Sequence, residues 1–264
     1  MATVVRAHDV ARTEHDHAAA LLRPEVEAMR TVLAGLSDQE WLAPTECPRW
    51  AVREVVSHVL GNAEVTLAPD LMALRLRDGA TRYPQLMRLD AMNEMAVDAW
   101  RDRQPRELLA EFTPLWRRVV ETLPGLGESV RAQLFDSGYP GAPPVSLGYV
   151  VDVILARDMW MHRVDICRAT GRALMPHEHD RGVVEQVLRD LDDVWGGPAF
   201  VLELTGAVAG DWQIGTGVPV ATVQGDAVDV LRTLSGRAEP EPELITRRGD
   251  PTVLGAMRAA RVPF

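Results

Sequence analysis

The sequence predicts an all-α four-helix bundle in the N-terminal part of the chain, followed by a smaller α+β domain. Up to Gly171, long segments carry apolar residues at helical spacing and are separated by stretches rich in proline and glycine. After Gly171 the pattern changes to short apolar runs bounded by glycine, which is typical of strands. We therefore place a helical domain at residues 14–174 and an α+β domain at residues 175–264.

The first helical segment begins near the sequence EHDHAAALL. His15 and His17 form a His-x-His pair, a pattern that can bind metal, but a solvated helix start is the simpler interpretation. Pro24 suits the first turn of a helix, where a backbone N–H is not needed. We expect helix from there to about Leu36.

The next helical segments lie at residues 51–67, 83–103 and 106–123. The first of them follows a break imposed by Pro44 and Pro48 and carries a clear apolar stripe. His58 lies beside the centre of this stripe, so we expect its side chain to line a cavity between helices. Helices joined by such connections fit an antiparallel bundle, in which sites are built from inward side chains of facing helices.

Residues 146–171 (SLGYVVDVILARDMWMHRVDICRATG) are the central element of this prediction. Ser146 and Gly171 are typical residues at the start and the end of a helix. At about 100° per residue, one face of this helix would carry Val151, Ile154, Leu155, Asp158, His162, Asp165 and Ala169. The face begins apolar and then presents an acid, an imidazole and a second acid.

Ionisable side chains on a core-facing stripe are costly unless they are paired or bind a metal. Asp158 and His162 are four residues apart, so both can point at one ion from adjacent turns. From this helix alone, two interpretations stay open: a metal site, or a buried Asp–His hydrogen bond that only supports packing.

The second domain is predicted from alternating short elements. A helix is expected at residues 181–193, followed by strands in FVLEL, DWQIG and ATVQG. The run DAVDVLRTLSGR reads as a helix, ELITRRG as a further strand, and PTVLGAMRAA as the last helix.

Composition limits the classes of partner. The chain of 264 residues has 28 basic and 38 acidic side chains and a formal net charge of −10, which disfavours nucleic-acid binding. Cys47 and Cys167 are far apart and indicate no disulfide framework, as expected of a reducing cytoplasm. We find no signal peptide and no apolar run of about 18 residues, so we expect a cytoplasmic protein without a membrane partner. A monomer or a homodimer fits equally well.

One stretch carries a family resemblance. WLAPTECPRWAVREVVSHVLGNAE contains, in order, Trp41, Pro44, Thr45, Cys47, Pro48, Trp50 and His58. This order resembles the opening of the mycothiol-dependent maleylpyruvate isomerase-like family, part of the DinB-like four-helix-bundle group. RDMWMHRVDICRATGR resembles the family's second metal-ligand helix, and DWQIGTGVPVATVQGDAVDVLRTLSGR resembles its small, sterol-carrier-like C-terminal domain. The resemblance extends from about Glu14 to Ala260.

The resemblance implies a divalent metal ion, usually zinc, held by three protein ligands with one coordination position open. Carried over residue by residue, the ligands are His58, Asp158 and His162. The family often has glutamate where this chain has Asp158, so this shorter acid is either a direct ligand or a partner of a bound water. An open position can hold a thiol as thiolate, its nucleophilic form, and the resemblance implies that this thiol is mycothiol.

Two further residues are candidates for catalytic roles. Asp165 lies one turn after His162 and either orients it or forms a salt bridge with Arg163, Arg168 or a neighbouring helix. Arg237 matches an arginine of the family's C-terminal domain and either binds a carboxylate of the substrate or cofactor, or is an ordinary helix-end arginine. Cys47, between two prolines, is expected to be structural, and Trp50 and Trp160 are expected in the core.

These residues favour a metal-dependent enzyme that uses a low-molecular-weight thiol for isomerisation or S-transfer on a small electrophilic substrate. Two alternatives stay open. One is a non-catalytic small-molecule-binding or regulatory module that keeps both domains. The other is a thiol-independent biosynthetic enzyme on the same scaffold, because one fold hosts many activities.

Overall fold

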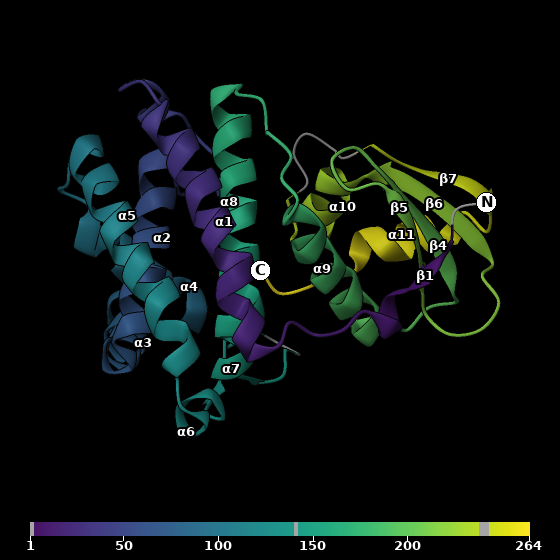
Figure 1. The fold of residues 1–264 in the computed structure, drawn as a ribbon, viewed down its shortest axis with the longest axis horizontal. Helices are drawn as coiled ribbons and strands as arrows, with labels where there is room; N and C mark the ends of the chain where they lie inside the picture. The colour runs from purple at the N-terminus through teal and green to yellow at the C-terminus, as the bar shows by residue number, and fades with distance from the viewer. Residues whose placement is uncertain (1–2, 140–141, 238–242) are drawn as a thin grey trace. The chain divides into compact units, whose positions relative to one another are not determined.

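The computed structural model describes residues 3–139, 142–237 and 243–264, and the chain divides into two compact units (Figure 1). One unit comprises residues 14–174, and the other joins residues 1–13 to residues 175–264. The N-terminal segment has no clear pattern in the sequence, yet it belongs to the second unit, where Val5–Arg6 forms a short strand.

The first unit is a helix bundle, which confirms the predicted fold class. Helices α1, α5, α2 and α8 pack in a closed ring, each against the next, and α3 and α4 pair with each other beside α2 (Figure 1). The helices are α1 (His15–Ala34), α2 (Val52–Leu67), α3 (Pro69–Arg82), α4 (Arg88–Trp100), α5 (Pro105–Thr122), α6 (Glu128–Arg131), α7 (Leu147–Tyr149) and α8 (Leu155–Thr170). The short strands β2 (Leu134–Phe135) and β3 (Val145–Ser146) pair antiparallel.

The central helix has the predicted ends. The hydroxyl of Ser146 accepts a hydrogen bond from the backbone N–H of Tyr149 at 3.0 Å, and Gly171 ends α8 with a φ of 68°. Between α7 and α8, Val150–Ile154 forms a π-helical segment, which the sequence pattern did not predict. π-Helical turns are rare and often occur at functional sites.

The region around residues 67–103 differs from the prediction. Helix is expected from residue 83, whereas the chain forms α3, leaves the helix near Pro84, and starts α4 at Arg88. The sequence pattern does not predict helix α3, because few of its residues are buried and it lacks a strong apolar stripe. It packs closely on α4 through Gly79, where a Cβ atom would lie 2.8 Å from the carbonyl oxygen of Ala91.

One expectation for α1 is wrong, and a second holds for the exposed His17 but not for His15. The helix begins at His15, so Pro24 lies in its interior rather than in the first turn. The imidazole of His15 is not solvated: its Nδ1 lies 2.7 Å from Oδ1 of Asp152, and its side chain is 16% exposed. Burial of Leu22, Val26 and Met29 stabilises α1 on either side of the proline. The partner of the His15 imidazole is Asp152, which is distant in the sequence.

The second unit contains a five-stranded sheet with the strand order β1-β5-β4-β6-β7. The strands are β1 (Val5–Arg6), β4 (Phe200–Thr205), β5 (Gly210–Ile214), β6 (Ala221–Asp226) and β7 (Leu244–Gly249). Strand β4 is antiparallel to β5 and parallel to β6, and β6 is antiparallel to β7. These strands coincide with the apolar runs identified in the sequence, except for β1.

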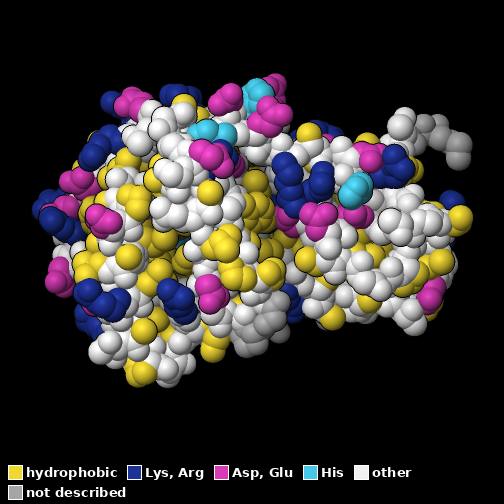
Figure 2. All heavy atoms as spheres, turned by 90° about the horizontal axis from the view of Figure 1, so that it is seen from below, with side chains coloured by type: hydrophobic (Ala, Val, Ile, Leu, Met, Phe, Trp, Pro, Cys, Tyr) yellow, Lys and Arg dark blue, Asp and Glu magenta, His cyan; other side chains and the backbone are white. Residues whose placement is uncertain are grey.

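Helices α9 (Asp180–Val194), α10 (Ala227–Leu234) and α11 (Thr252–Ala259) pack against this sheet and bury alternate residues of its strands. In the described parts of the chain, no helix is both long and apolar enough to span a membrane. Figure 2 shows acidic and basic side chains intermingled on one face of the molecule, with apolar side chains exposed between them.

Candidate metal centre

Two helices of the bundle bring the predicted ligands together. His58 projects from α2, and Asp158 and His162 project from adjacent turns of α8. The Nε2 atom of His58 lies 3.5 Å from Oδ2 of Asp158, and the Nε2 atom of His162 lies 3.3 Å from Oδ1 of the same carboxylate. Donor atoms of the three residues all lie within 4.8 Å of one another.

These separations suit a tetrahedral ion. Ligand atoms bound at about 2.0–2.1 Å with tetrahedral angles lie about 3.3–3.4 Å apart, and Nε2 of His162 lies at such a distance, 3.3 Å, from Oδ1 of Asp158. Nε2 of His58 lies 3.5 Å from the other oxygen of this carboxylate. Two imidazoles and one carboxylate form a donor set typical of catalytic zinc sites, which keep a fourth position open. The side chains of His58 and His162 are 4% and 5% exposed, while that of Asp158 is 16% exposed. The residues therefore fit such an ion, although their binding of a metal stays a prediction.

A second carboxylate orients His162 from the other side of its ring. The Nδ1 atom of His162 lies 2.9 Å from Oδ2 of Asp165, which is fully buried. A carboxylate that accepts from one imidazole nitrogen leaves the other as a ligand, the arrangement common around zinc. Arg163 and Arg168 pair with Glu25 and Glu46, so the structure favours the orienting interpretation of Asp165 over an ion pair with these arginines.

In the metal-free cluster, Asp158 and His162 stabilise each other's charged forms. Burial alone would raise the pKa of Asp158, but the neighbouring charge of His162 holds it well below its usual range. Burial alone would lower the pKa of His162, but the charge of Asp158 and hydrogen bonds from the imidazole to Asp158 and Asp165 raise it well above its usual range. Both shifts favour a charged imidazole paired with a carboxylate when no ion is bound.

The loop before α2 covers the cluster and is tied down by its own hydrogen bonds. The hydroxyl of Thr45 donates to the carbonyl oxygen of Trp50 at 2.7 Å, and the residues on either side, Pro44 and Ala51, form an isolated antiparallel bridge. The thiol of Cys47 donates to Oδ2 of Asp165 at 3.6 Å. Donor atoms of Cys47, His162 and Asp165 lie within 4.8 Å of one another, so the thiol is beside the cluster and its structural role stays a prediction.

Trp50 was expected in the hydrophobic core, but it also contacts the candidate site. Its ring stacks on that of His58 with a centroid distance of 4.9 Å, and its Nε1 donates to Oε1 of Glu94 at 3.0 Å. The stacking fixes the plane of the imidazole. Trp160, in contrast, is fully buried, as expected for a core residue.

Asn62 is a site residue that the sequence reasoning did not assign. It lies one turn after His58 on α2, and its Nδ2 is 2.9 Å from Oδ2 of Asp158 and 3.1 Å from Nε2 of His58. Its position on the same face of the helix as His58 was the available signal, because residues four apart share a helix face.

Comparison with known families agrees with this architecture. The sequence model described as "Mycothiol maleylpyruvate isomerase N-terminal domain" matches residues 22–167, more than half of the chain. The chain belongs to the mycothiol maleylpyruvate isomerase family. No functionally curated protein matches the sequence significantly.

Two solved structures share the fold of this family member. One is the mycothiol-dependent maleylpyruvate isomerase, with 15% identity and a TM-score of 0.59, and the other is a point mutant of that enzyme, with 16% identity and a TM-score of 0.56. Each match covers 94% of this chain and 97% of the other. The similarity therefore includes both units of the maleylpyruvate isomerase fold.

Other acids near the cluster have partners of their own in this family member. Glu64 accepts hydrogen bonds from Trp100 and Arg75, and Glu94 accepts from Trp50 and Arg49. Among the described residues, neither groups with His58 and His162 as a possible metal ligand. Asp158 is therefore the carboxylate best placed to complete the donor set.

Arg237 belongs to the second unit and follows α10. Its backbone N–H donates to the carbonyl oxygen of Arg232 at 2.9 Å, directly after Gly236, whose φ is 86°. This geometry is that of a helix C-terminus. The predicted role of its guanidinium in binding a carboxylate stays a prediction.

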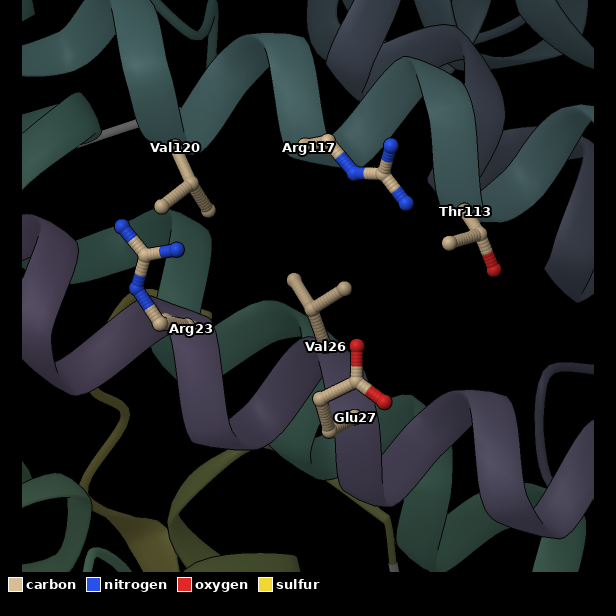
Figure 3. A pocket seen from close by; sticks show the side chains of 6 residues that line it. All are labelled: Arg23, Val26, Glu27, Thr113, Arg117 and Val120. Atoms are coloured by element: carbon tan, nitrogen blue, oxygen red, sulfur yellow. The ribbon is translucent and has the colours of Figure 1, made fainter.

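A pocket of about 80 Å³ lies elsewhere in the bundle, between α1 and α5 (Figure 3). It is lined by Arg23, Val26, Glu27, Thr113, Arg117 and Val120. None of these residues belongs to the His58–Asp158–His162 cluster, so we do not include this pocket in the candidate site.

Proposed function

We propose that this protein is a metal-dependent enzyme that uses mycothiol, or a similar low-molecular-weight thiol, for isomerisation or S-transfer on a small electrophilic substrate. The observation that carries the proposal is the cluster of His58, Asp158 and His162, whose donor atoms lie within 4.8 Å of one another and form a set typical of catalytic zinc sites. Membership in the mycothiol maleylpyruvate isomerase family supports the choice of thiol.

Zinc with an open position would supply a Lewis acid that keeps a bound thiol as thiolate, the form that attacks an electrophilic carbon. The chain's own contribution is to present the ligands. His58 and His162 offer Nε2, and Asp158 offers a carboxylate whose negative charge partly neutralises the dication. Asp165 accepts from Nδ1 of His162 and so increases the basicity of the ligating nitrogen.

The cluster is largely shielded from bulk water, which supports the proposed chemistry. His58 is 4% exposed and lies under the ring of Trp50, while Asp158 keeps some exposure. Interactions between charges are stronger in such a poorly hydrated site than in water. We further propose that Arg237 binds a carboxylate of the substrate or of the thiol, since a guanidinium recognises a carboxylate through two parallel hydrogen bonds.

The first test is metal content. Protein purified without chelator should contain about one equivalent of zinc, and His162→Ala should lose it. His17→Ala is a matched control, because this exposed histidine lies at the start of α1, on another helix. A wild-type protein that is purified without metal and binds no divalent metal when it is added would rule out the metal-dependent function.

The second test separates the proposed enzyme from its alternatives. Titration of the zinc-loaded protein with mycothiol should give saturable binding that His162→Ala abolishes, and turnover of maleylpyruvate should require the thiol. Thiol binding without turnover of any electrophile would favour a binding module. Metal binding without thiol binding would favour a thiol-independent enzyme on the same scaffold.

A further inference from the structure

The amide of Asn62 connects the two helices at the candidate metal centre. Its Nδ2 lies 2.9 Å from Oδ2 of Asp158 and 3.1 Å from Nε2 of His58, so one nitrogen is within hydrogen-bonding distance of two predicted ligands. We propose that Asn62 is the positioning residue of this centre, which holds Asp158 of α8 in place beside His58 of α2. This inference rests on the proposed metal-dependent function.

Hydrogen-bond chemistry defines what each partner must be. An amide NH₂ group has two N–H donors and no acceptor, so both neighbouring atoms have to accept. The opposite amide orientation would place an oxygen 2.9 Å from a carboxylate oxygen, which is repulsive. The bond to Oδ2 of Asp158 can persist when an ion is bound, because a carboxylate oxygen has two lone pairs. Nε2 of His58 has one lone pair, so an ion would take the place of the amide hydrogen there.

The two oxygens of the Asp158 carboxylate have different partners. Asn62 donates to Oδ2, while Oδ1 faces Nε2 of His162 at 3.3 Å. Because the amide occupies one lone pair of Oδ2, Oδ1 is the oxygen with fewer competing partners, and we infer that Asp158 would bind an ion chiefly through Oδ1. A single carboxylate oxygen and two imidazoles favour a four-coordinate ion such as zinc over calcium, which takes six to eight oxygen ligands.

The hydrogen bond from Asn62 to Asp158 connects helix α2 to helix α8. Asn62 follows His58 by one turn on the same helix, whereas Asp158 is on α8. The amide thereby fixes the acid of one helix relative to the imidazole of the other before any ion arrives. Such preorganisation increases affinity because the ligands lose less conformational freedom on binding.

The test measures zinc affinity of the full-length protein by competition with a chromogenic chelator. Asn62→Ala removes both donors, and Asn62→Leu removes them while keeping a side chain of similar size. We expect each variant to bind zinc about 10–100-fold more weakly than wild type, the usual cost of losing a hydrogen bond to a ligand. Asn93→Ala on α4 is the matched control and should bind zinc as wild type does.

Two further readouts distinguish positioning from general stability. The visible absorption spectrum of the cobalt-loaded protein should change in Asn62→Leu, because ligand geometry changes, while the thermal midpoint of the metal-free variant stays close to that of wild type.

The outcomes separate this inference from the proposed function. Equal zinc affinity and equal cobalt spectra in wild type, Asn62→Leu and Asn93→Ala would overturn the role of Asn62 and leave the metal site intact. A wild-type protein that binds no metal would overturn the metal-dependent function and, with it, the role of Asn62 toward an ion.

Discussion

The Nδ1 atom of His162 lies 2.9 Å from the Oδ2 atom of Asp165, three residues further along α8, and the carboxylate is fully buried. This pair fixes the orientation of the ring, so that Nε2 faces Asp158. A buried acid in this position is expensive unless it is paired, and the imidazole is the partner that makes its burial tolerable. The contact therefore couples the packing of α8 to the geometry of the candidate centre.

Replacing Asp165 by Asn tests this coupling. The amide keeps the size of the side chain but removes the charge that raises the basicity of His162, so zinc affinity should fall about 10–100-fold. Chelator competition measures the change. Asp78→Asn, an exposed acid paired with Arg77 on α3, is the control and should leave affinity unchanged. Unchanged affinity in Asp165→Asn would mean that its carboxylate serves packing alone.

Substitutions of Asp158 test whether it is a direct ligand. Asp158→Ala removes a bond and a neutralising charge and should lose zinc nearly as completely as His162→Ala. Asp158→Glu keeps a carboxylate and should keep the metal, with altered activity because the longer side chain moves the ion. Elemental analysis of the purified variants checks both expectations. Stoichiometric zinc in Asp158→Ala would assign the third ligand to another acid, and Glu64 and Glu94 would be tested next.

Zinc binding should release a proton from the cluster. Burial opposes charge on His162, but Asp158 raises its pKa well above the usual range, so the metal-free imidazole is protonated at neutral pH. An ion needs the lone pair of Nε2, and binding must therefore displace this proton. Calorimetric titrations in buffers of different ionisation enthalpy should report about one proton released per ion, and affinity should fall as the pH is lowered. Binding without proton release would contradict the charge assigned to His162.

The same pair predicts the pH dependence of the metal-free protein. A raised folded-state pKa for His162 stabilises the fold below the unfolded value of about 6.5, and this stability is lost as the pH rises through the folded pKa. The lowered pKa of Asp158 acts in the opposite direction, since its contribution is present above about 3.9 and is lost as the pH falls through the folded pKa. Urea denaturation with chelator should therefore show the pair's full contribution between about pH 4 and 6.5, and His162→Gln should flatten the decline at higher pH.

Close packing of α2 on α4 offers a test of the scaffold. A Cβ atom on Gly61 would lie 2.3 Å from the Cβ atom of Ala96, so Gly61→Ala forces the two helices apart and should cost about 1–3 kcal/mol of unfolding free energy. Gly125→Ala is the control, because a Cβ atom there would meet nothing within 4 Å. Urea denaturation of both variants measures the difference. Equal stability would show that the helix pair adjusts without strain.

Removal of the second unit tests the role proposed for Arg237. Residues 14–174 include all three candidate ligands and form one compact unit, so this fragment should keep its helical circular dichroism and its zinc. It should lose turnover if Arg237 binds the substrate or the thiol. Arg237→Lys in the full chain is the companion variant, because lysine keeps the charge but not the paired hydrogen bonds. Full activity of the fragment would exclude Arg237 from the reaction.

Local rules in the sequence determined much of the helical architecture. Caps at Ser146 and Gly171 and the apolar periodicity of residues 51–67 predicted the helices that carry the ligands, since both signals act over a few residues. The spacing of Asp158 and His162 likewise depends only on the helix period. These rules did not predict α3, because this largely exposed helix has little apolar periodicity. They did not predict β1 either, because its two residues form a strand only by pairing with β5.

Tertiary structure decided which side chains meet at the centre. His58 and Asp158 are a hundred residues apart in the sequence, and only the packing of α2 against α8 brings Nε2 and Oδ2 to 3.5 Å. The contacts of Asn62 and the stacking of Trp50 on His58 arise from the same packing. A sequence pattern reports the face of a helix on which a residue lies, but hydrogen bonds between helices also depend on their separation and rotation, which the whole core sets.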